Sequence, residues 1–357
     1  MLYAMSDERE LIRQCIPRLI QWYAASRRVL PWRQEPTPSH VWISEIMLQQ
    51  TRIEAVLGYY ERFLRELPTV EALAAVEEDR LLKLWEGLGY YSRARNLKKA
   101  AQLLVEQYGG ELPRTAAELK KLPGIGDYTA GAIASIAYGQ PEPAVDGNVL
   151  RVLARILASG EDIMQSAVRA RFASLLREQY PVGEDAALLT EGIMELGETL
   201  CIPNGEARCE LCPVRSCCRA HLSGTVELYP VKSPPRGRRI EQRTVLLLRC
   251  SGRYAIRKRA DRGLLAGLWE FPNEKGAISA GEITERLTEQ GTQVLGCEPC
   301  GEARHVFTHV EWHMSGYLVD CAAEWGGFVW ASPAQIAADY SIPTAFRFYQ
   351  SRMEAEA

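Results

Sequence analysis

The chain has 357 residues, about the length of two domains; 47% of them are hydrophobic and 24% are charged. This globular composition excludes wholesale disorder, no stretch approaches the ~20 apolar residues of a membrane span, and the N-terminus lacks the pattern of a signal peptide. The formal net charge of −3 argues against a uniformly basic surface for nucleic acid.

Residues 1 to about 226 are expected to be helical throughout. Apolar residues recur at helical intervals, and Pro and Gly separate the periodic stretches, as at Pro31, Pro68 and Pro141. The expected helices cover 7–27, 40–67, 80–88, 95–109, 115–122, 127–139, 149–158 and 187–200.

The character of the sequence changes after this helical part. Residues 227–243 contain three prolines and a basic cluster, which is typical of an extended linker. Strand-like segments follow at 244–250, 254–259, 303–321 and 327–332, with one helix at 280–291. We therefore expect a helical domain over 1–226, a linker over 227–243 and a smaller α+β domain over 244–357.

Glu45 lies within VWISEIML, an apolar helical run. A carboxyl group in such surroundings loses its hydration and tends to keep its proton, which suits a general acid. The alternative is that Glu45 is an ordinary solvated residue on a helix surface.

Residues 116–139 (AAELKKLPGIGDYTAGAIASIAYG) indicate a helix, a tight turn and a second helix. Gly124 and Gly126 permit left-handed or closely approaching backbone, and free N–H groups at the start of the second helix can bind a phosphate. The alternative is a turn that only joins two packed helices.

Asp146 directly precedes an apolar helix that begins within VDGNVLRVLAR. An aspartate there caps the helix by accepting backbone N–H bonds, and these bonds favour its anionic form, as a carboxylate that stabilises a cation requires. Two carboxyl groups whose surroundings separate their pKa values form an acid and stabiliser pair, so Glu45 and Asp146 are expected to act together.

Five of the ten cysteines fall within 201–218. Without an export signal, disulfides are not expected, and thiolates gathered in one loop indicate a zinc or iron–sulfur site. Because they do not form two separated C-x₂₋₄-C pairs, as most zinc sites do, a 4Fe-4S cluster is favoured; buried free thiols are the alternative.

Together these segments resemble the helix–hairpin–helix DNA glycosylase superfamily in its endonuclease III-like branch. LPWRQEPTPSHVWISEIMLQQT and GLGYYSRARN are further similar to the adenine DNA glycosylases of the MutY family. The resemblance implies hydrolytic excision of adenine mispaired with 8-oxoguanine or guanine in double-stranded DNA. Related glycosylase/lyases carry a lysine where this chain has Tyr128, so we expect a monofunctional enzyme.

The resemblance also assigns catalytic roles. Glu45 would protonate adenine at N7, Asp146 would stabilise the oxocarbenium ion, and Tyr128 and Asn148 would support it. The pocket for the flipped adenine would be formed by Arg28, Leu30, Trp32, Arg33, Ile53 and Glu191, although Leu30 and Ile53 could equally be core residues.

Further contacts follow from the same resemblance. Gln50 and Tyr90 would enter the duplex stack, Thr51 and Leu88 would lie near the lesion, and Gly124 and Gly126 would meet the DNA backbone. The cluster ligands would be Cys201, Cys209, Cys212 and Cys218. The first gap holds seven residues where the family pattern has six, and Cys217 competes with Cys218 for the last position.

In the second domain, residues 263–276 (GLLAGLWEFPNEKG) resemble the Nudix fold. In Nudix hydrolases the glutamates of an REUxEE helix bind magnesium; the following helix, 280–291, lacks that spacing, so hydrolysis is not expected. In the family this domain reads 8-oxoguanine, and Thr308 of Phe307-Thr308-His309 would meet the damaged base; the alternative is a plain strand with alternating polar residues.

Two other functions remain open: a thymine or uracil mismatch glycosylase of the same branch, and a non-catalytic iron–sulfur DNA-binding protein. Neither accounts for both the Phe-Thr-His motif and the two carboxylates. Basic residues concentrate in 92–99, in the linker and in 256–262, so salt-sensitive DNA binding is expected despite the net charge. We expect a monomer in the bacterial cytoplasm, associated with the nucleoid.

Overall fold

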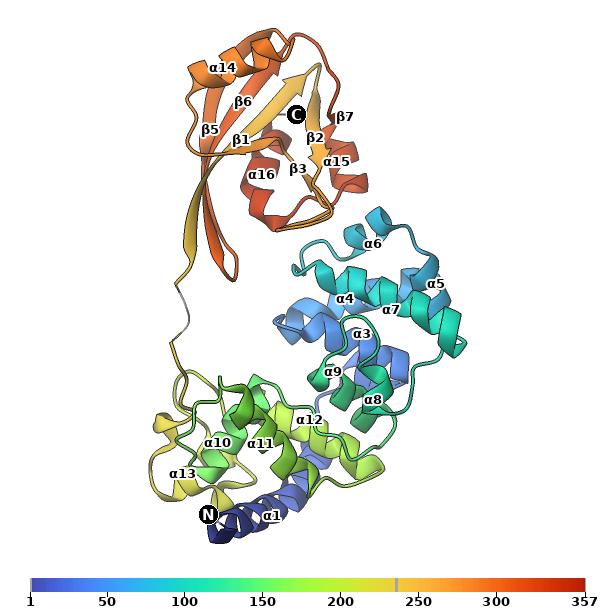
Figure 1. The fold of residues 1–357 in the computed structure, drawn as a ribbon, viewed down its shortest axis with the longest axis vertical. Coiled ribbons are helices and arrows are strands. Elements are labelled where there is room, and N and C mark those ends of the chain that lie inside the picture. Colours follow the sequence, from blue (N-terminus) through green and yellow to red (C-terminus); the bar gives the residue numbers. More distant parts are fainter. Residues whose placement is uncertain (1, 235–236, 357) are drawn as a thin grey trace. The chain divides into compact units, whose positions relative to one another are not determined.

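The computed structural model describes residues 2–234 and 237–356, which form two compact units (Figure 1). The first unit comprises 1–75 and 96–234, and the second comprises 76–95 and 235–357. Two residues of the expected linker, Pro235 and Arg236, lie outside the described residues. Within the described part of the chain, no helix combines the length and apolarity needed to cross a membrane.

The first unit is built of helices, as the apolar periodicity predicts. Its elements are α1 (Leu2–Ser26), α2 (Pro31–Gln34), α3 (Pro38–Leu48), α4 (Ile53–Glu66), α5 (Val70–Ala75), most of α7 (Ser92–Tyr108), α8 (Ala116–Leu119), α9 (Asp127–Ala132), the π-helical η1 (Ile133–Ala137), α10 (Gly147–Leu157), α11 (Ser166–Arg177), α12 (Glu184–Thr199), α13 (Arg219–Leu222) and the 3₁₀ turns η2 (Cys209–Leu211), η3 (Arg215–Cys217) and η4 (Val226–Leu228).

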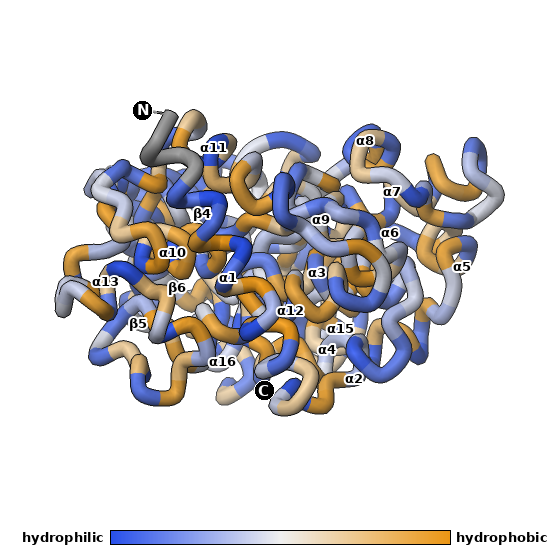
Figure 2. The backbone as a smooth tube through the Cα atoms, turned by 90° about the horizontal axis from the view of Figure 1, so that it is seen from below, coloured by the Kyte–Doolittle hydropathy of each residue, from blue (hydrophilic) through white to orange (hydrophobic). Residues whose placement is uncertain are grey.

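The core of this unit forms where α1, α10, α11 and α12 meet. Phe172, Leu189 and Val149 are fully buried there, and Val214 and Cys217 of the cysteine loop pack on the same cluster. Apolar and hydrophilic residues alternate along the helices, as burial of one helix face requires (Figure 2). The cysteine loop is therefore anchored to the helices that also carry Asp146 and Glu191.

The single helix expected over 40–67 is wrong, because the structure has two helices there. α3 ends at Leu48 and α4 begins at Ile53. Gln50 between them has a φ of 58°, a left-handed conformation that a helix cannot include. No Pro or Gly marks this break, so the periodic pattern runs through it undetected.

The second unit is α+β, as expected. Five strands form the sheet order β3-β2-β1-β6-β5, with β4 paired to β1 and β7 paired to β2. Its elements are α6 (Glu78–Leu84), β1 (Arg239–Cys250), β2 (Arg253–Lys258), β3 (Trp269–Glu270), β4 (Asn273–Lys275), α14 (Ala280–Glu289), β5 (Val294–Val306), β6 (Val310–Cys321), β7 (Val329–Ala331), α15 (Pro333–Asp339), the 3₁₀ turn η5 (Thr344–Phe346) and α16 (Arg347–Ala355).

Both faces of this sheet are covered, which explains the unbroken apolar run in β1. Val245 and Leu247 pack with α15 and α16, whereas Leu246 and Leu248 pack with α14 (Figure 1). β1 and β6 run parallel, with Leu247 opposite Leu318. β5 and β6 form an antiparallel hairpin.

Two boundaries differ from the sequence-based expectation. β1 begins at Arg239, so the last five residues of the expected linker are strand, paired with β6. Residues 76–95, expected within the helical domain, belong to the second unit because their hydrogen bonds reach residues such as Ser341. Sequence periodicity cannot reveal such non-local contacts.

Candidate active site

A pocket of about 780 Å³ opens in the first unit between α2, α3, α9, α10 and α12. Its polar lining is unusually rich in carboxyl groups, with Glu45 and Asp146 on opposite elements. The residues that line it are Trp32, Arg33, Val41, Ser44, Glu45, Leu48, Thr51, Ile53, Tyr128, Ile136, Asp146, Asn148, Glu191, Met194, Glu195 and Glu198.

Glu45 is a buried acid on α3, with only 6% of its surface exposed. The hydroxyl of Tyr128, on α9, donates a hydrogen bond of 2.6 Å to Glu45 Oε2. Loss of hydration raises the pKa of Glu45 to about 7, whereas the Tyr128 hydrogen bond and the charge of Arg33 oppose this rise. Glu45 therefore holds a proton near neutral pH, as a general acid must.

Asp146 is the N-cap of α10. Its Oδ1 accepts a hydrogen bond of 2.8 Å from the Val149 amide, and its Oδ2 accepts one of 2.9 Å from Asn148 Nδ2. Burial nevertheless raises the pKa of Asp146, while these hydrogen bonds lower it. The capping bonds favour the anionic form, as expected, but loss of hydration in the pocket has the larger effect on this pKa.

Two arginines and two glutamates form an ion-pair network around the buried Glu195 at one side of the pocket. Glu195 is 4% exposed and pairs with both Arg28 and Arg33, each through an Nη2–Oε2 contact of 3.0 Å. Glu191 accepts a hydrogen bond of 3.1 Å from Tyr23 and lies 3.4 Å from Arg33 Nε. Among the described residues Arg33 Nη1 is buried without a partner, which leaves an N–H donor for a bound ligand.

The pocket is connected to the cysteine loop through α10. Arg151 donates from Nη2 to Asn148 Oδ1 at 2.8 Å and from Nε to the Cys201 carbonyl at 2.8 Å. Asn148 in turn donates to Asp146. The orientation of the Asp146 carboxylate thus depends on a buried arginine that also binds the start of the cysteine loop.

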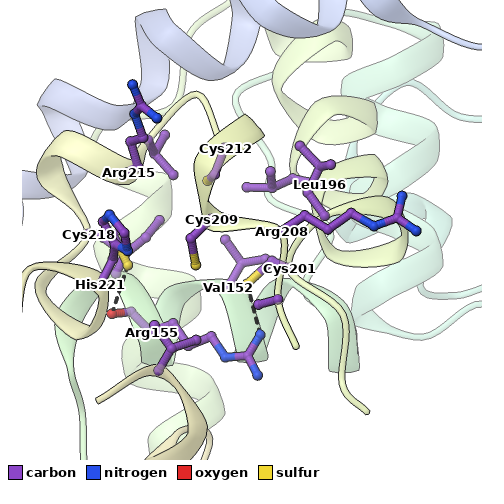
Figure 3. Close-up of a pocket in the computed structure, with 15 residues that line it drawn as sticks. Val152, Arg155, Leu196, Cys201, Arg208, Cys209, Cys212, Arg215, Cys218 and His221 are labelled. Carbon is purple, nitrogen blue, oxygen red and sulfur yellow. Dashed lines mark hydrogen bonds between the residues drawn. The ribbon is translucent and has the colours of Figure 1, made fainter. Parts of the chain in front are cut away.

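The cysteine loop surrounds a second cavity of about 390 Å³, lined by Cys201, Cys209, Cys212 and Cys218 (Figure 3). Arg155 Nη1 donates to Cys201 Sγ at 3.2 Å. Within residues 2–234 and 237–356, no three His, Cys, Asp or Glu side chains lie close enough to hold a single metal ion. Four thiols that line one cavity are the ligand type of both zinc and iron–sulfur sites.

Cys217 does not line this cavity. Its thiol lies in the core, 2.8 Å from the thiol of Cys15 on α1, and the two residues are 4% and 2% exposed. The neighbouring Cys218 faces the cavity. Adjacent cysteines thus point into different environments.

The other predicted residues occupy several places. Thr51, Trp32 and Ile53 line the pocket, whereas Arg28 reaches it through Glu195, and Leu30 is a buried residue that precedes α2. Leu88, Tyr90 and Thr308 belong to the second unit, and Gln50 is exposed in the turn between α3 and α4.

In the hairpin before α9, only one of the two glycines has the left-handed backbone that the sequence predicts. Gly124 has a φ of 80°, and a Cβ there would lie 2.7 Å from Asn96 Cβ, so only glycine fits. Gly126 is the N-cap of α9 in an extended conformation, with open space where a side chain would be. An exposed backbone at a helix start is accessible to an anion.

Sequence reasoning missed seven of the residues that line the pocket: Val41, Ser44, Leu48, Ile136, Met194, Glu195 and Glu198. Ser44 and Met194 lie one residue before Glu45 and three residues after Glu191, so the known positions could have suggested them. Glu195 follows Glu191 by one helical turn on α12, and this i, i+4 spacing was a usable signal.

Comparisons with known proteins identify the family of each of the two units. Residues 43–178 match the HhH-GPD superfamily of base excision DNA repair proteins, and residues 244–350 match the NUDIX domain family. The adenine DNA glycosylase of Mus musculus is 32% identical over 94% of this chain and 78% of its own length.

Solved structures give the same fold for the helical unit. A thermostable thymine-DNA glycosylase matches 62% of this chain and 99% of its own, with a TM-score of 0.54 and 25% identity. A trapped endonuclease III–DNA covalent intermediate matches 60% of this chain and 98% of its own, with a TM-score of 0.51 and 26% identity. The chain belongs to the adenine DNA glycosylase family, with an endonuclease III-like helical domain followed by a Nudix-like domain.

Proposed function

We propose that this protein is a monofunctional glycosylase that removes adenine mispaired with 8-oxoguanine or guanine during base excision repair. The observation that carries the proposal is that Glu45, Asp146 and Tyr128 line one pocket, into which a flipped base could enter. A buried acid and a capped carboxylate are the two groups that cleavage of an N-glycosidic bond requires.

In the proposed mechanism Glu45 donates its proton to N7 of the flipped adenine. Protonation withdraws electrons from the glycosidic bond, which then breaks heterolytically as the neutral base departs. The Asp146 carboxylate, held by Val149 and Asn148, stabilises the oxocarbenium ion that remains on the sugar. Water then adds to the sugar carbon and gives up a proton to the Glu45 carboxylate, which leaves an abasic site and restores the acid.

Tyr128 has two proposed roles. Its hydrogen bond to Glu45 orients the acid toward the base. Since it occupies the position of the lysine nucleophile in related lyases, no Schiff base with the sugar can form, and the strand is left intact.

The adenine pocket is proposed to include Arg28, Leu30, Trp32, Arg33, Ile53 and Glu191. The unpartnered N–H of Arg33 and the Glu191 carboxyl offer a donor and an acceptor to the edge of the base. DNA contacts are proposed for Gln50, Thr51, Leu88, Tyr90, Gly124 and Gly126, with Thr308 at the damaged base.

Cys201, Cys209, Cys212 and Cys218 are proposed to hold a 4Fe-4S cluster, because their thiols line one cavity. Such a cluster would fix the conformation of the loop. Arg155 donates to the sulfur of Cys201, a contact that would stabilise a thiolate ligand.

The division of function is likewise a proposal: catalysis in the helical domain, expected over 1–226, and lesion recognition in the domain expected over 244–357, to which residues 76–95 are joined in the structure. The segment 227–243 connects the two, and its last five residues belong to strand β1. We propose that the protein acts as a monomer on double-stranded DNA. In a bacterial cell that substrate lies in the nucleoid, within the cytoplasm.

The proposal is tested by single-turnover assays of base release from duplexes containing A:8-oxoguanine, A:G or T:G. Release of adenine from the first two and no release of thymine from the third is expected. Release of thymine would instead favour a thymine mismatch glycosylase, because the helical unit also resembles the structure of a thymine-DNA glycosylase.

A further inference from the structure

Helix α6 is docked on the C-terminal part of the second unit. The hydroxyl of Ser341, which is 2% exposed, donates a hydrogen bond of 3.2 Å to the carbonyl of Leu82. Lys83 Nζ donates to the carbonyl of Tyr340 at 3.0 Å. Both contacts join α6 to the turn that follows α15.

Two further contacts flank these hydrogen bonds. The Ile342 amide donates to Glu86 Oε1 at 2.8 Å, and Lys258 Nζ lies 2.6 Å from Asp79 Oδ1. One contact lies beyond the C-terminal end of α6 and the other near its N-terminal end. The helix is thus held along its whole length.

The loop that follows α6 is stiffened from within by Arg93. This buried guanidinium donates to the carbonyls of Leu88 and Gly89 at 3.0 and 3.2 Å, and it lies 5.4 Å from the centre of the Trp85 ring. Trp85 Nε1 also donates to the Gly89 carbonyl at 3.1 Å. Displacement of α6 would therefore carry the loop with it.

Tyr90 projects from this loop toward the β5–β6 hairpin. It has a φ of 46°, a conformation that non-glycine residues rarely adopt, and its ring is 48% exposed. Its hydroxyl shares a hydrogen bond of 3.3 Å with Thr308 Oγ1 at the tip of the hairpin. Both hydroxyls are solvent-accessible, and each can form a hydrogen bond to a nucleobase.

We propose that residues 76–95 and the C-terminal domain act as one lesion-reading element, in which docking of α6 on residues 340–342 sets the position of Tyr90 against Thr308. Lys83 and Ser341 are then positioning residues for recognition of 8-oxoguanine, although neither needs to touch DNA. This inference rests on the proposed function and extends it to residues remote from both loops.

The test compares the Lys83→Met/Ser341→Ala double variant with a matched control, Arg13→Met/Ser351→Ala. The control removes an exposed i, i+3 ion pair with Glu10 and a serine hydrogen bond to the Phe348 carbonyl, neither of which involves α6. Adenine release is measured under single-turnover conditions on A:8-oxoguanine and A:G duplexes, and amide hydrogen exchange is followed in the free proteins.

In the double variant, the preference for 8-oxoguanine over guanine is expected to fall about tenfold, the effect of losing two ordinary hydrogen bonds. The rate on A:G should stay unchanged, and exchange should quicken in 85–91 but not in α10. The control should resemble the wild type in every measurement.

An equal loss on both duplexes, or an unchanged preference with faster exchange in 85–91, would overturn the inference. Unchanged exchange in 85–91 would also overturn it, and this measurement does not require activity. A wild-type protein that releases adenine from neither duplex would instead contradict the proposed function.

Discussion

The hydroxyl of Tyr128 and the carboxyl of Glu45 are joined by a hydrogen bond of 2.6 Å, although the two residues lie 83 positions apart. The bond links the helix after the hairpin to a buried acid of the pocket. It also opposes the effect of burial on the pKa of Glu45. The acid strength of Glu45 is therefore a property of the pair.

The pH dependence of adenine release should report this pair. Because Glu45 acts as an acid with a pKa of about 7, the single-turnover rate should fall as pH rises through that value. Tyr128→Phe removes a contact that lowers this pKa, so the fall should move to higher pH. A shift to lower pH, or none, would contradict the assigned contact.

Tyr138→Phe is the matched control for this experiment. It removes a hydrogen bond of the same length, 2.6 Å to the Leu112 carbonyl, from a residue that does not line the pocket. Its pH profile should coincide with that of the wild type.

Burial of Glu45 should also make stability depend on pH. Its pKa is about 7 in the folded protein against 4.5 for an unperturbed glutamate, so the folded state binds the proton more tightly and stability is lost as pH rises between these values. Glu45→Gln should therefore raise the free energy of unfolding at pH 8 by up to about 3 kcal/mol, with little gain at pH 4.5.

Urea denaturation at the two pH values measures this difference. Glu54→Gln, at an exposed position of α4, is the control and should show no pH-dependent gain. A Glu45→Gln protein that is destabilised equally at both pH values would show that the carboxyl is not the source of the effect.

Cys217 and Cys218 should respond differently to the same substitution. Cys218→Ser removes a thiol from the cavity and should sharply reduce the iron content of the purified protein. Cys217→Ser alters a core contact with Cys15 and should leave the iron in place. If only the Cys217 variant lost iron, Cys217 would be the cluster ligand and Cys218 would not.

Replacing Tyr128 by lysine should introduce an amine where related lyases carry one. We expect Tyr128→Lys to gain some strand cleavage, detected as a borohydride-trapped protein–DNA adduct that the wild type does not form. Adduct formation by the wild type would show that the enzyme is not monofunctional.

Much of the catalytic site could be predicted from local sequence. Apolar neighbours on both sides of Glu45 indicate that it is buried. The position of Asp146 directly before an apolar helix identifies it as a cap. The cysteine spacing indicates a metal loop. Each of these signals depends on a few adjacent residues, so it can be recognised without knowledge of the fold.

The remaining features depend on tertiary contacts. The direction of the Asp146 pKa shift follows from how deeply the assembled pocket buries the group, and the choice between Cys217 and Cys218 follows from which thiol meets α1. Glu195 looks like a polar residue of an ordinary amphipathic helix until Arg28 and Arg33 are brought to it.

Segment 76–95 is the largest departure from the sequence-based domain boundaries. Its helical pattern resembles that of its neighbours. Several of its hydrogen bonds nevertheless reach residues more than 250 positions away, such as the bond between Leu82 and Ser341, which lie 259 positions apart. Periodicity records which face of a helix is buried, but not against what.

The most direct test of the account is the release of adenine from an A:8-oxoguanine duplex by Asp146→Asn. Asparagine caps a helix as well as aspartate does, so α10 and DNA binding should persist. Loss of the negative charge should slow adenine release by about a thousandfold. Release at the wild-type rate, with binding intact, would contradict the role of Asp146 and the proposed chemistry with it.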